Sequence, residues 1–399
     1  MKHKFFLIVL CLLSLYACST NIQKELSLNE NCFVIDLDKN NEPSIPLSNY
    51  YKSVKTIILE TNKDCLLGMV TEFQAFDGFM YVLDMFVSKS LFVFDMDGRF
   101  IRKIGNMGGG PGEYIQPWDF TVDMENDVIY LLDYGRRIHK YQFDGTFVQT
   151  ITPKVENTNI EYIQYYNGKL YMSVKAYNPS SADYSLLEAD ANNGKILSKS
   201  LPVKYNKGWA KQKISNHSFF ILRLNDPPLY NQLFMDYIVT IGEDIAPYIE
   251  LKSKNLVTAK DLDNLPELGS SPERFVRYLI EIPKIWDVHS FVENDDIFLF
   301  RYRYRNAYTS AIYHKKTGMV ELANYLNNDL IYKQDKRGSI GGFTFSDSEG
   351  SFEILLDNQI ENLKASIRNN ETAPDLDKAD EILKLDEDAN PIIFFYEFK

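Results

Sequence analysis

Short runs of apolar, β-branched and aromatic residues alternate with turn dipeptides along most of the chain. Runs at residues 79–84 and 91–95 are followed by the turn Asp97-Gly98 and a further run at residues 99–104. The same order returns in the runs and turn at residues 128–133, 137–141, 144–145 (Asp-Gly) and 146–151. Short runs joined by Asp-Gly are typical of antiparallel strands connected by hairpins. The pattern therefore predicts two consecutive antiparallel sheets of the same design.

The two units repeat at a spacing of about fifty residues. Tyr81 and Tyr130 are 49 positions apart, and Gly98 and Gly145 are 47 positions apart. Weaker copies of the unit occupy residues 169–200 and residues 297–323. A period of this length fits the four-stranded blade of a β-propeller, so the chain is predicted to be all-β.

The N-terminus has the pattern of a lipoprotein signal. Lys2 and Lys4 precede an apolar run at residues 5–16, which fits a secretory segment and is too short to span a bilayer. The run closes on Leu15-Tyr16-Ala17-Cys18, which resembles the bacterial lipobox. That resemblance implies cleavage before Cys18 and acylation of this residue, and several acyl chains make a stable membrane anchor. An ordinary secretory signal with an incidental cysteine is the alternative.

Three segments follow from this pattern. We predict a lipoprotein signal peptide at residues 1–17, a lipidated tether at residues 18–31 and a propeller domain at residues 32–399. The tether is polar and short of aromatic residues, as expected of a flexible linker. Ser19 directly after Cys18 implies sorting to the outer membrane, and the sequence leaves open whether the domain faces the periplasm or the outside.

One loop carries a family resemblance. The chain resembles the opening of an NHL repeat in the stretch Ile104-Gly105-Asn106-Met107-Gly108-Gly109-Gly110-Pro111-Gly112-Glu113-Tyr114. This stretch, the lipobox and the C-terminal run at residues 390–396 together resemble the six-bladed β-propeller lipoproteins of Bacteroidetes. The resemblance is strong over residues 54–150 and implies a fold and a location, without an activity. Between Asp133 and Arg137 the chain is one residue shorter than an NHL repeat and lacks its Asn-His, so no loop contact is carried over.

We therefore predict a six-bladed β-propeller of four-stranded antiparallel blades. Six blades in the 382 residues that remain after removal of 17 from 399 average about 60 residues, more than the repeat, so insertions are expected. Helical patterns place short helices in the C-terminal third, at residues 271–280, 355–367 and 377–385. We expect the last strand, residues 392–398, to pair with an N-terminal segment such as residues 32–37 and so close the ring.

Composition narrows the classes of function. The chain has 55 acidic and 43 basic residues, a net charge of −12, which excludes a generic nucleic-acid binder that needs a basic face. Its 26 Phe, 26 Tyr and 3 Trp favour strands over helices. After Cys18 only Cys32 and Cys65 remain. In an oxidising envelope they could form a disulfide, and buried free thiols are the alternative.

Local motifs of catalysis and metal binding are missing from the sequence. The glycine run at residues 108–112 is followed by Glu113 instead of Gly-Lys-Ser/Thr, so it does not fit a phosphate-binding loop. We predict that Gly110, Pro111 and Gly112 form a structural turn between blades. The five histidines show no metal-ligand spacing. We therefore predict no metal, no cofactor and no catalytic residue.

Candidate binding residues come from the loops at one end of the propeller. In a four-stranded blade, the loop into the first strand and the loop between the second and third strands open at the same end, and loops carry function. Arginine binds carboxylate or phosphate and tyrosine offers rigid contact area. We predict that a polar or acidic ligand is bound at this mouth by Tyr134, Arg136, Tyr177, Arg303, Arg305 and Tyr308.

The alternative for these residues is structural, with the arginines forming a solvated face and the tyrosines filling space between sheets. In an extended strand Arg301, Arg303 and Arg305 share one face, and the intervening tyrosines share the other. If the binding assignment is right, replacing Arg303 and Arg305 together with alanine weakens binding without lowering the melting temperature.

The function predicted from the sequence is that of a non-enzymatic cell-envelope lipoprotein of the outer membrane. Its propeller binds a ligand or protein partner, such as a glycan or peptide, and the membrane is contacted through the lipid anchor. One alternative is a propeller hydrolase or lyase that acts on acidic glycans with His289 or His139. Another is a structural subunit of an envelope complex, which a large exposed apolar patch would favour.

Overall fold

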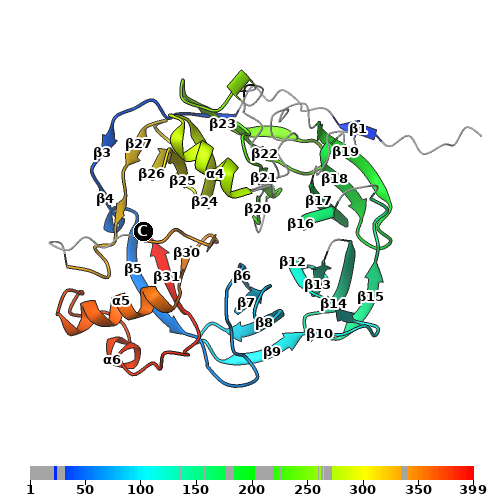
Figure 1. Ribbon diagram of the computed structural model, residues 1–399, viewed down its shortest axis with the longest axis horizontal. Helices are drawn as coiled ribbons and strands as arrows, with labels where there is room; N and C mark the ends of the chain where they lie inside the picture. Colours follow the sequence, from blue (N-terminus) through cyan, green and yellow to red (C-terminus); the bar gives the residue numbers. More distant parts are fainter. Residues whose placement is uncertain are drawn as a thin grey trace, which may run out of the picture.

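Six small sheets stand side by side in a ring in the computed structural model (Figure 1). The structure describes residues 22–24, 32–134, 136–155, 159–175, 184–202, 219–223, 226–258, 260–261, 264, 272–333 and 340–399. Each sheet is one blade, and its strands run antiparallel to one another from the centre of the ring outward. The arrangement is a six-bladed β-propeller, which confirms the predicted fold class.

The first two blades match the two strong sequence repeats. Blade one consists of β6 (Glu72–Phe76), β7 (Phe79–Asp84), β8 (Ser90–Asp95) and β9 (Phe100–Ile104). Two short strands follow, β10 (Asn106–Met107) and β11 (Glu113–Tyr114). Blade two consists of β12 (Pro117–Asp123), β13 (Val128–Asp133), β14 (Arg137–Gln142) and β15 (Phe147–Ile151). The boundaries of these strands lie close to the predicted ones because the Asp-Gly turns end each hairpin.

The other four blades complete the ring. Blade three has β16 (Asn159–Tyr166), β17 (Lys169–Lys175), β18 (Tyr184–Asp190) and β19 (Ile196–Pro202). Blade four has β20 (Phe219–Ile221), β21 (Leu229–Asn231), β22 (Tyr237–Thr240) and β23 (Ala246–Lys252). Blade five has β24 (Ile285–Glu293), β25 (Ile297–Tyr304), β26 (Ala307–His314) and β27 (Val320–Ala323). Blade six has β29 (Phe345–Ser346), β30 (Gly350–Leu355), β31 (Ile392–Phe398) and β5 (Tyr51–Ile58).

The N-terminal part of the chain runs along the outside of the ring before it enters blade six (Figure 1). It pairs in parallel with an outer strand at each step. The pairs are β1 (Ile22–Lys24) with β19, β2 (Phe33–Asp36) with β23, β3 (Asn41–Glu42) with β27, and β4 (Ile45–Pro46) with β28 (Leu326–Asn327). Ile22–Lys24 belong to the segment predicted to be the tether. A short 3-10 helix, η1 (Leu47–Asn49), then leads into β5.

The sequence-based assignment of the closing strand was wrong. Residues 32–37 were expected to pair with the last strand, whereas β5 pairs with β31 and β2 lies at the edge of blade four. Burial explains the difference. Strand β5 has eight residues and fully buries Tyr51 and Ile57, whereas β2 has four residues and fully buries only Ile35. The longer segment, which buries more apolar side chains, therefore completes the blade that joins an N-terminal strand to the last strand of the chain.

Three helices lie in the described residues of the C-terminal third, as predicted. They are α4 (Pro272–Glu281), α5 (Asp357–Arg368) and α6 (Ala379–Ile382). Helix α5 begins later than its apolar pattern indicated, because Leu355 still belongs to β30. It packs on blade six through Ile360 and Leu363. None of the helices in the described ranges is both long and apolar enough to cross a membrane.

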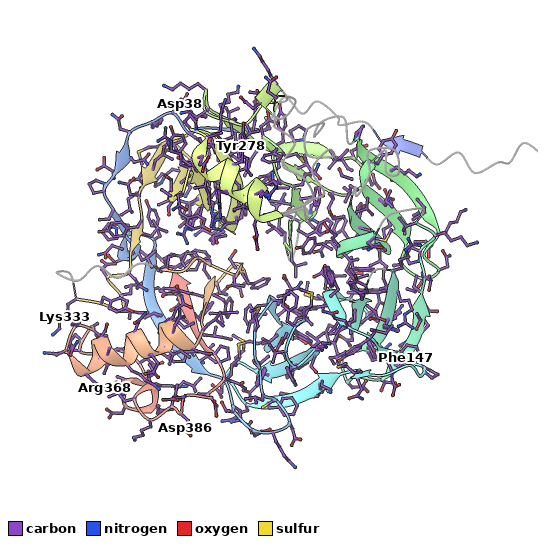
Figure 2. All side chains as sticks on the ribbon, viewed as in Figure 1. Asp38, Phe147, Tyr278, Lys333, Arg368 and Asp386 are labelled. Carbon is purple, nitrogen blue, oxygen red and sulfur yellow. The ribbon has the colours of Figure 1, made fainter. Side chains whose placement is uncertain are left out.

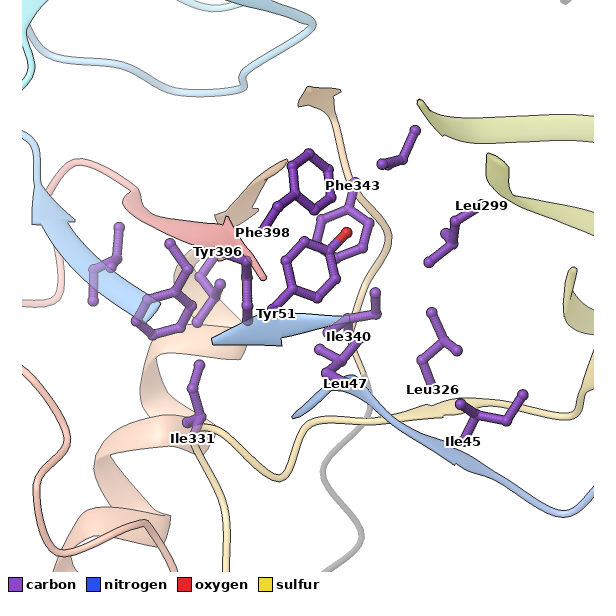
Figure 3. Packing of buried hydrophobic residues seen from close by; sticks show 14 of the residues in the cluster. Ile45, Leu47, Tyr51, Leu299, Leu326, Ile331, Ile340, Phe343, Tyr396 and Phe398 are labelled. Carbon is purple, nitrogen blue, oxygen red and sulfur yellow. The ribbon is translucent and has the colours of Figure 1, made fainter. Parts of the chain in front are cut away.

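Side chains fill the space between neighbouring blades (Figure 2), and the largest of the fully buried ones are aromatic. Between blades five and six, the rings of Tyr51, Phe343, Tyr396 and Phe398 lie together (Figure 3). Tyr51 and Phe398 stack with their ring centres 5.1 Å apart. Because radial sheets diverge outward, large flat side chains suit the space between them, which accounts for the aromatic content of the chain.

The two cysteines downstream of Cys18 are free in the structure. Cys65 is buried, and its Sγ donates to the carbonyl oxygen of Glu60 at 3.2 Å. Cys32 is half-buried. The sequence left open a disulfide or two free thiols, and in the structure both thiols are free.

Candidate functional site

Asp133, at the end of the second strand of blade two, holds the neighbouring loops by hydrogen bonds. In blade two, Asp133 Oδ1 accepts the backbone N–H groups of Ile115 at 3.0 Å, Gln116 at 2.9 Å and Tyr134 at 2.9 Å. Its Oδ2 accepts a hydrogen bond from Arg137. Burial alone would raise the pKa of Asp133, but its hydrogen bonds and the charge of Arg137 outweigh that effect and lower the pKa to about 2. Asp133 therefore fixes two loops at one end of the propeller.

The glycine-rich loop between these blades forms a turn closed by its own carboxylate. Gly110 N–H donates to Glu113 Oε2 at 2.8 Å, and Glu113 N–H donates to the Gly110 carbonyl at 3.0 Å. Pro111 and Gly112 form the tip. Gly112 has φ of +76°, and a Cβ there would lie 2.6 Å from the Phe147 ring. The place that an anion would take is thus occupied by Glu113.

The predicted mouth residues fall on two separate hairpins. Tyr134 is 59% exposed and rests edge-on against Trp118, and Arg136 beside it is exposed. Tyr177 lies outside the described residues. In blade five the structure brings Arg303 and Tyr308 together.

Arg303 is held by the side chains around it. Its guanidinium lies 4.4 Å from the Tyr308 ring centre and 5.2 Å from the Trp286 ring centre. It donates to the Tyr308 hydroxyl, and its Nε is 3.8 Å from Asp287 Oδ2. Arg305 departs from the expected alternation, because it sits in the hairpin turn with φ of +54° and lies over Tyr304. Only Arg301 and Arg303 share the face that contacts Tyr308.

The two hairpins belong to blades two and five, which stand opposite each other in the ring (Figure 1). Both connect the second and third strands of a blade, so both open at the same end of the propeller. Among the described residues of the predicted set, only Arg303 and Tyr308 of blade five contact each other. A binding mouth built from all six residues stays a prediction.

Arg303→Ala is expected to lower the free energy of unfolding by about 1–3 kcal/mol, because it removes a cation held between two aromatic rings. This differs from the sequence-based expectation that melting would be unaffected. The matched control is Arg305→Ala on the exposed turn, which should change stability by less than about 0.5 kcal/mol. Urea denaturation of the two variants checks this, and equal effects would contradict the structural role of Arg303.

A cavity of about 290 Å³ lies where the first strands of the blades meet. It is lined by residues of all six blades. Its polar lining consists of Thr71, Glu72, Gln74, Asp119, Tyr162, Gln164, His289, Ser290, Thr344 and Ser346. Of these, only His289 was singled out from the sequence. His139, the other histidine considered for catalysis, is buried in blade two with Nδ1 3.0 Å from Thr150 Oγ1, and it does not line the cavity.

Bulges in the first strands direct side chains into this cavity. Strand β24 has two irregularities, and Asp287 and Ser290 within them have φ of +60° and +54°. His289 Nδ1 lies 2.9 Å from Ser290 Oγ. Strands β12 and β16 also shift register, next to Asp119 and Tyr162. Bulges and left-handed non-glycine residues are costly and are often found at functional sites.

A polar network holds the loop that lies beside the cavity between blades five and six. Arg301 Nη1 donates to the Gly341 carbonyl at 2.5 Å, and Gly341 N–H donates to Glu353 Oε1 at 2.6 Å. Tyr396 Oη donates to Glu353 Oε2 at 2.7 Å. Burial raises the pKa of Glu353 to about 7. The network fixes residues 340–344, which supply Phe343 and Thr344 to the cavity.

Two carboxyl groups of neighbouring blades share the other side of the cavity. Burial raises the pKa of Glu72 to about 7. Burial, and then the charge of Glu72, raise the pKa of Asp119 well above its usual range. Asp119 Oδ2 accepts the N–H of Ile163 at 2.7 Å, which joins blade two to blade three. No group of three or more His, Cys, Asp or Glu within the described part of the chain is arranged to hold a metal ion.

Glu72→Gln and Asp119→Asn are each expected to stabilise the protein at pH 8. A carboxyl group whose folded pKa is raised binds its proton more tightly in the folded state, so stability falls as pH rises above the unfolded pKa of about 4. Removing that cost at Glu72 is worth about 1–3 kcal/mol at pH 8, and the gain should vanish at about pH 3, below the unfolded pKa, where the group is protonated in both states. Urea denaturation at the two pH values measures it, with the exposed Glu125→Gln as control. A gain independent of pH would contradict this.

Comparison with solved structures shows the same fold elsewhere. A "Putative exported protein" from Bacteroides fragilis superimposes with a TM-score of 0.72 at 16% identity, covering 94% of this chain and 100% of that chain. The RRP9 WD40 repeats are a more distant match, with a TM-score of 0.41 and 8% identity, covering 89% of this chain and 100% of that chain. The Neurospora crassa Pan2 WD40 domain matches with a TM-score of 0.36 and 9% identity, covering 70% of this chain and 73% of that chain. No curated protein matches the chain. The sequence matches the family described as "Domain of unknown function (DUF4934)" over residues 32–397, and the protein therefore belongs to the DUF4934 family.

Proposed function

We propose that this protein is an outer-membrane lipoprotein, anchored through Cys18, whose propeller binds a small polar ligand of glycan type in the central cavity. The observation that carries the proposal is the cavity itself, which all six blades line with hydrogen-bonding and aromatic groups. The export signal of the sequence and the exported Bacteroides protein of the same fold support a location outside the cytoplasm.

The size and lining of the cavity fit a small polyhydroxylated molecule. Its 290 Å³ is close to the lower end of the range of about 300–1,000 Å³ typical of small-molecule sites. Sugar hydroxyls need both donors and acceptors, which the hydroxyls of Tyr162 and Ser290 and the carboxyl groups of Glu72 and Asp119 provide. The half-buried rings of Phe220 and Phe345 add apolar surface for the C–H face of a sugar.

Calorimetric titration of the purified protein with mono- and disaccharides and with short peptides tests this function. Tyr162→Phe should weaken binding about tenfold, because a hydrogen bond made in a desolvated site is lost. Tyr278→Phe, on helix α4, is the matched control and should leave affinity unchanged. Equal affinity of both variants, or absence of glycan binding, would overturn the proposal. Conversion of the ligand in the same assay would favour the hydrolase or lyase alternative, for which His289 faces the same cavity as the carboxyl pair.

A structural role in an envelope complex is the second candidate, and one observation favours it. Exposed apolar side chains gather on the loops of blades one and two at the end where their hairpins open. They are Leu66, Met69, Phe86, Val87, Met107, Ile115 and Tyr134. Exposed apolar patches often mark protein interfaces. A photo-crosslinking residue at Phe86 should then capture one defined envelope protein, whereas the same residue at the exposed Met319 of blade five should not.

A further inference from the structure

One side of the central cavity presents hydrogen-bond acceptors without matching donors. Glu72 and Gln74 alternate on β6 and so face the same way, and both line the cavity with Asp119 of blade two. Gln74 Nε2 donates one of its two N–H groups to the Phe120 carbonyl at 3.3 Å, and Asp119 Oδ2 accepts the N–H of Ile163. The other Asp119 oxygen, the Glu72 carboxyl group and the Gln74 amide oxygen remain to meet a ligand.

The amide oxygen of Gln74 is the second, independent sign of a ligand. The side chain is 7% exposed, and its Oε1 has no hydrogen-bond partner among the residues that the structure describes. A buried acceptor without a donor is unfavourable, and native proteins rarely keep one unless a bound molecule or water satisfies it. A ligand that brings donors to this side of the cavity would satisfy it.

We propose that the cavity recognises its ligand through a protonated amine held between Glu72, Asp119 and Gln74. This inference rests on the proposed function, in that the central cavity is the binding site, and it names the ligand as a sugar with a free amino group. An ammonium group carries three N–H donors and no acceptor, which matches three acceptors from two neighbouring blades. A hydroxyl offers one donor and would leave the others unsatisfied.

The surroundings favour an organic cation over a neutral group. The half-buried rings of Phe220 and Phe345 line the same cavity, and aromatic faces attract cations. Two carboxyl groups in a partly desolvated site interact with a positive charge more strongly than they would in water. Within the described part of the chain, no group of three or more His, Cys, Asp or Glu is arranged to hold a metal ion instead.

Proton release should accompany binding of the amine. The ionisable groups that line the cavity together with the carboxyl pair are Tyr162 on β16 and His289 on β24. Without a ligand, burial and mutual repulsion keep a proton on the pair. The ammonium charge takes the place of that proton, so affinity should rise from pH 6 to pH 8 and the binding heat should depend on the ionisation enthalpy of the buffer.

The experiment compares glucosamine, N-acetylglucosamine and glucose by calorimetry with the purified full-length protein. At pH 7.0 glucosamine should bind at least tenfold more tightly than the other two sugars. The Glu72→Gln/Asp119→Asn double variant should lose this preference, and Glu125→Gln should retain it. Because the double variant keeps the shapes of both side chains, its glucose affinity and its melting curve show whether the cavity is intact.

The outcomes separate this inference from the proposed function. If all three sugars bind equally, the amine site is overturned and glycan binding stands. If methylammonium binds with the expected dependence on the carboxyl pair but no sugar does, the amine site is supported and glycan binding is overturned. If neither sugars nor methylammonium bind, both fail. Micromolar binding of Ca²⁺ that is abolished in the double variant would assign the pair to a metal ion and overturn the amine site.

Discussion

Asp133→Ala is expected to lower the free energy of unfolding by about 3–5 kcal/mol. The carboxylate is 1% exposed and accepts three backbone N–H groups and a hydrogen bond from Arg137. Removing it leaves these donors, and the charge of Arg137, without their acceptor beside a tightly packed blade. Two loops at the open end of blade two should therefore loosen together.

The pH dependence of the lost free energy of unfolding tests whether the Asp133 carboxylate is the cause of the loss. The folded-state pKa of about 2 lies below the unfolded value of about 3.9, so the contribution of Asp133 is fully present above pH 4 and is lost as pH falls through 2. Urea denaturation should show the difference between the wild type and Asp133→Ala shrinking by about 2–3 kcal/mol over that interval, which is the part of the loss that the pKa shift accounts for. Asp144→Ala, an exposed aspartate of the same blade, is the control and should cost much less. A difference that stays the same down to pH 2 would indicate lost packing instead.

Local sequence signals determined the strands that are neighbours in the chain. The hairpin of β8 and β9 was predictable because Asp95 accepts the N–H of Asp97 and Gly98 adopts φ of +88°, a conformation that glycine permits. The same turn chemistry recurs at Gly145. Strand order within blades one and two thus follows from short-range geometry, and the predicted boundaries lie within a few residues of the observed ones.

Pairing between distant segments could not be predicted in the same way. Strand β2 pairs with β23, more than two hundred residues later, and β5 pairs with β31 at the other end of the chain. Nothing in residues 32–37 distinguishes the outer edge of blade four from the open edge of blade six, since both offer free backbone groups. Which segment pairs with β31 depends on how much apolar surface each segment buries in its final position. The buried area is defined only once the ring has assembled.

The candidate site was missed because its residues lie inside strands. Glu72 and Asp119 resemble the polar positions of an ordinary half-exposed strand, whereas binding residues were expected in loops. One signal could have found them. Gln74 and Thr121 pair with Tyr81 and Tyr130, the equivalent tyrosines of the two repeats, so the residues two positions earlier, Glu72 and Asp119, are also equivalent. Acidic residues at one repeat position of the innermost strand would converge on the axis of any propeller.

Closure of the ring through β5 leads to the second large expected effect. Ile57→Asp should lower the free energy of unfolding by about 4 kcal/mol or more, because it replaces a fully buried side chain with a carboxylate in the apolar wedge between blades six and one. Strand β31 would then lose its outer neighbour, and the two ends of the chain would separate. Limited proteolysis should cut first in blade six.

The matched control is Val148→Asp on the outer strand of blade two, where the valine is 45% exposed and should tolerate the charge. Thermal denaturation followed by circular dichroism compares the two variants, since both introduce the same side chain at a β-branched strand position. If Ile57→Asp and Val148→Asp melt together, β5 does not hold the ring closed. The parallel pairing of β2, β3 and β4 with β23, β27 and β28 would then have to keep the ring closed.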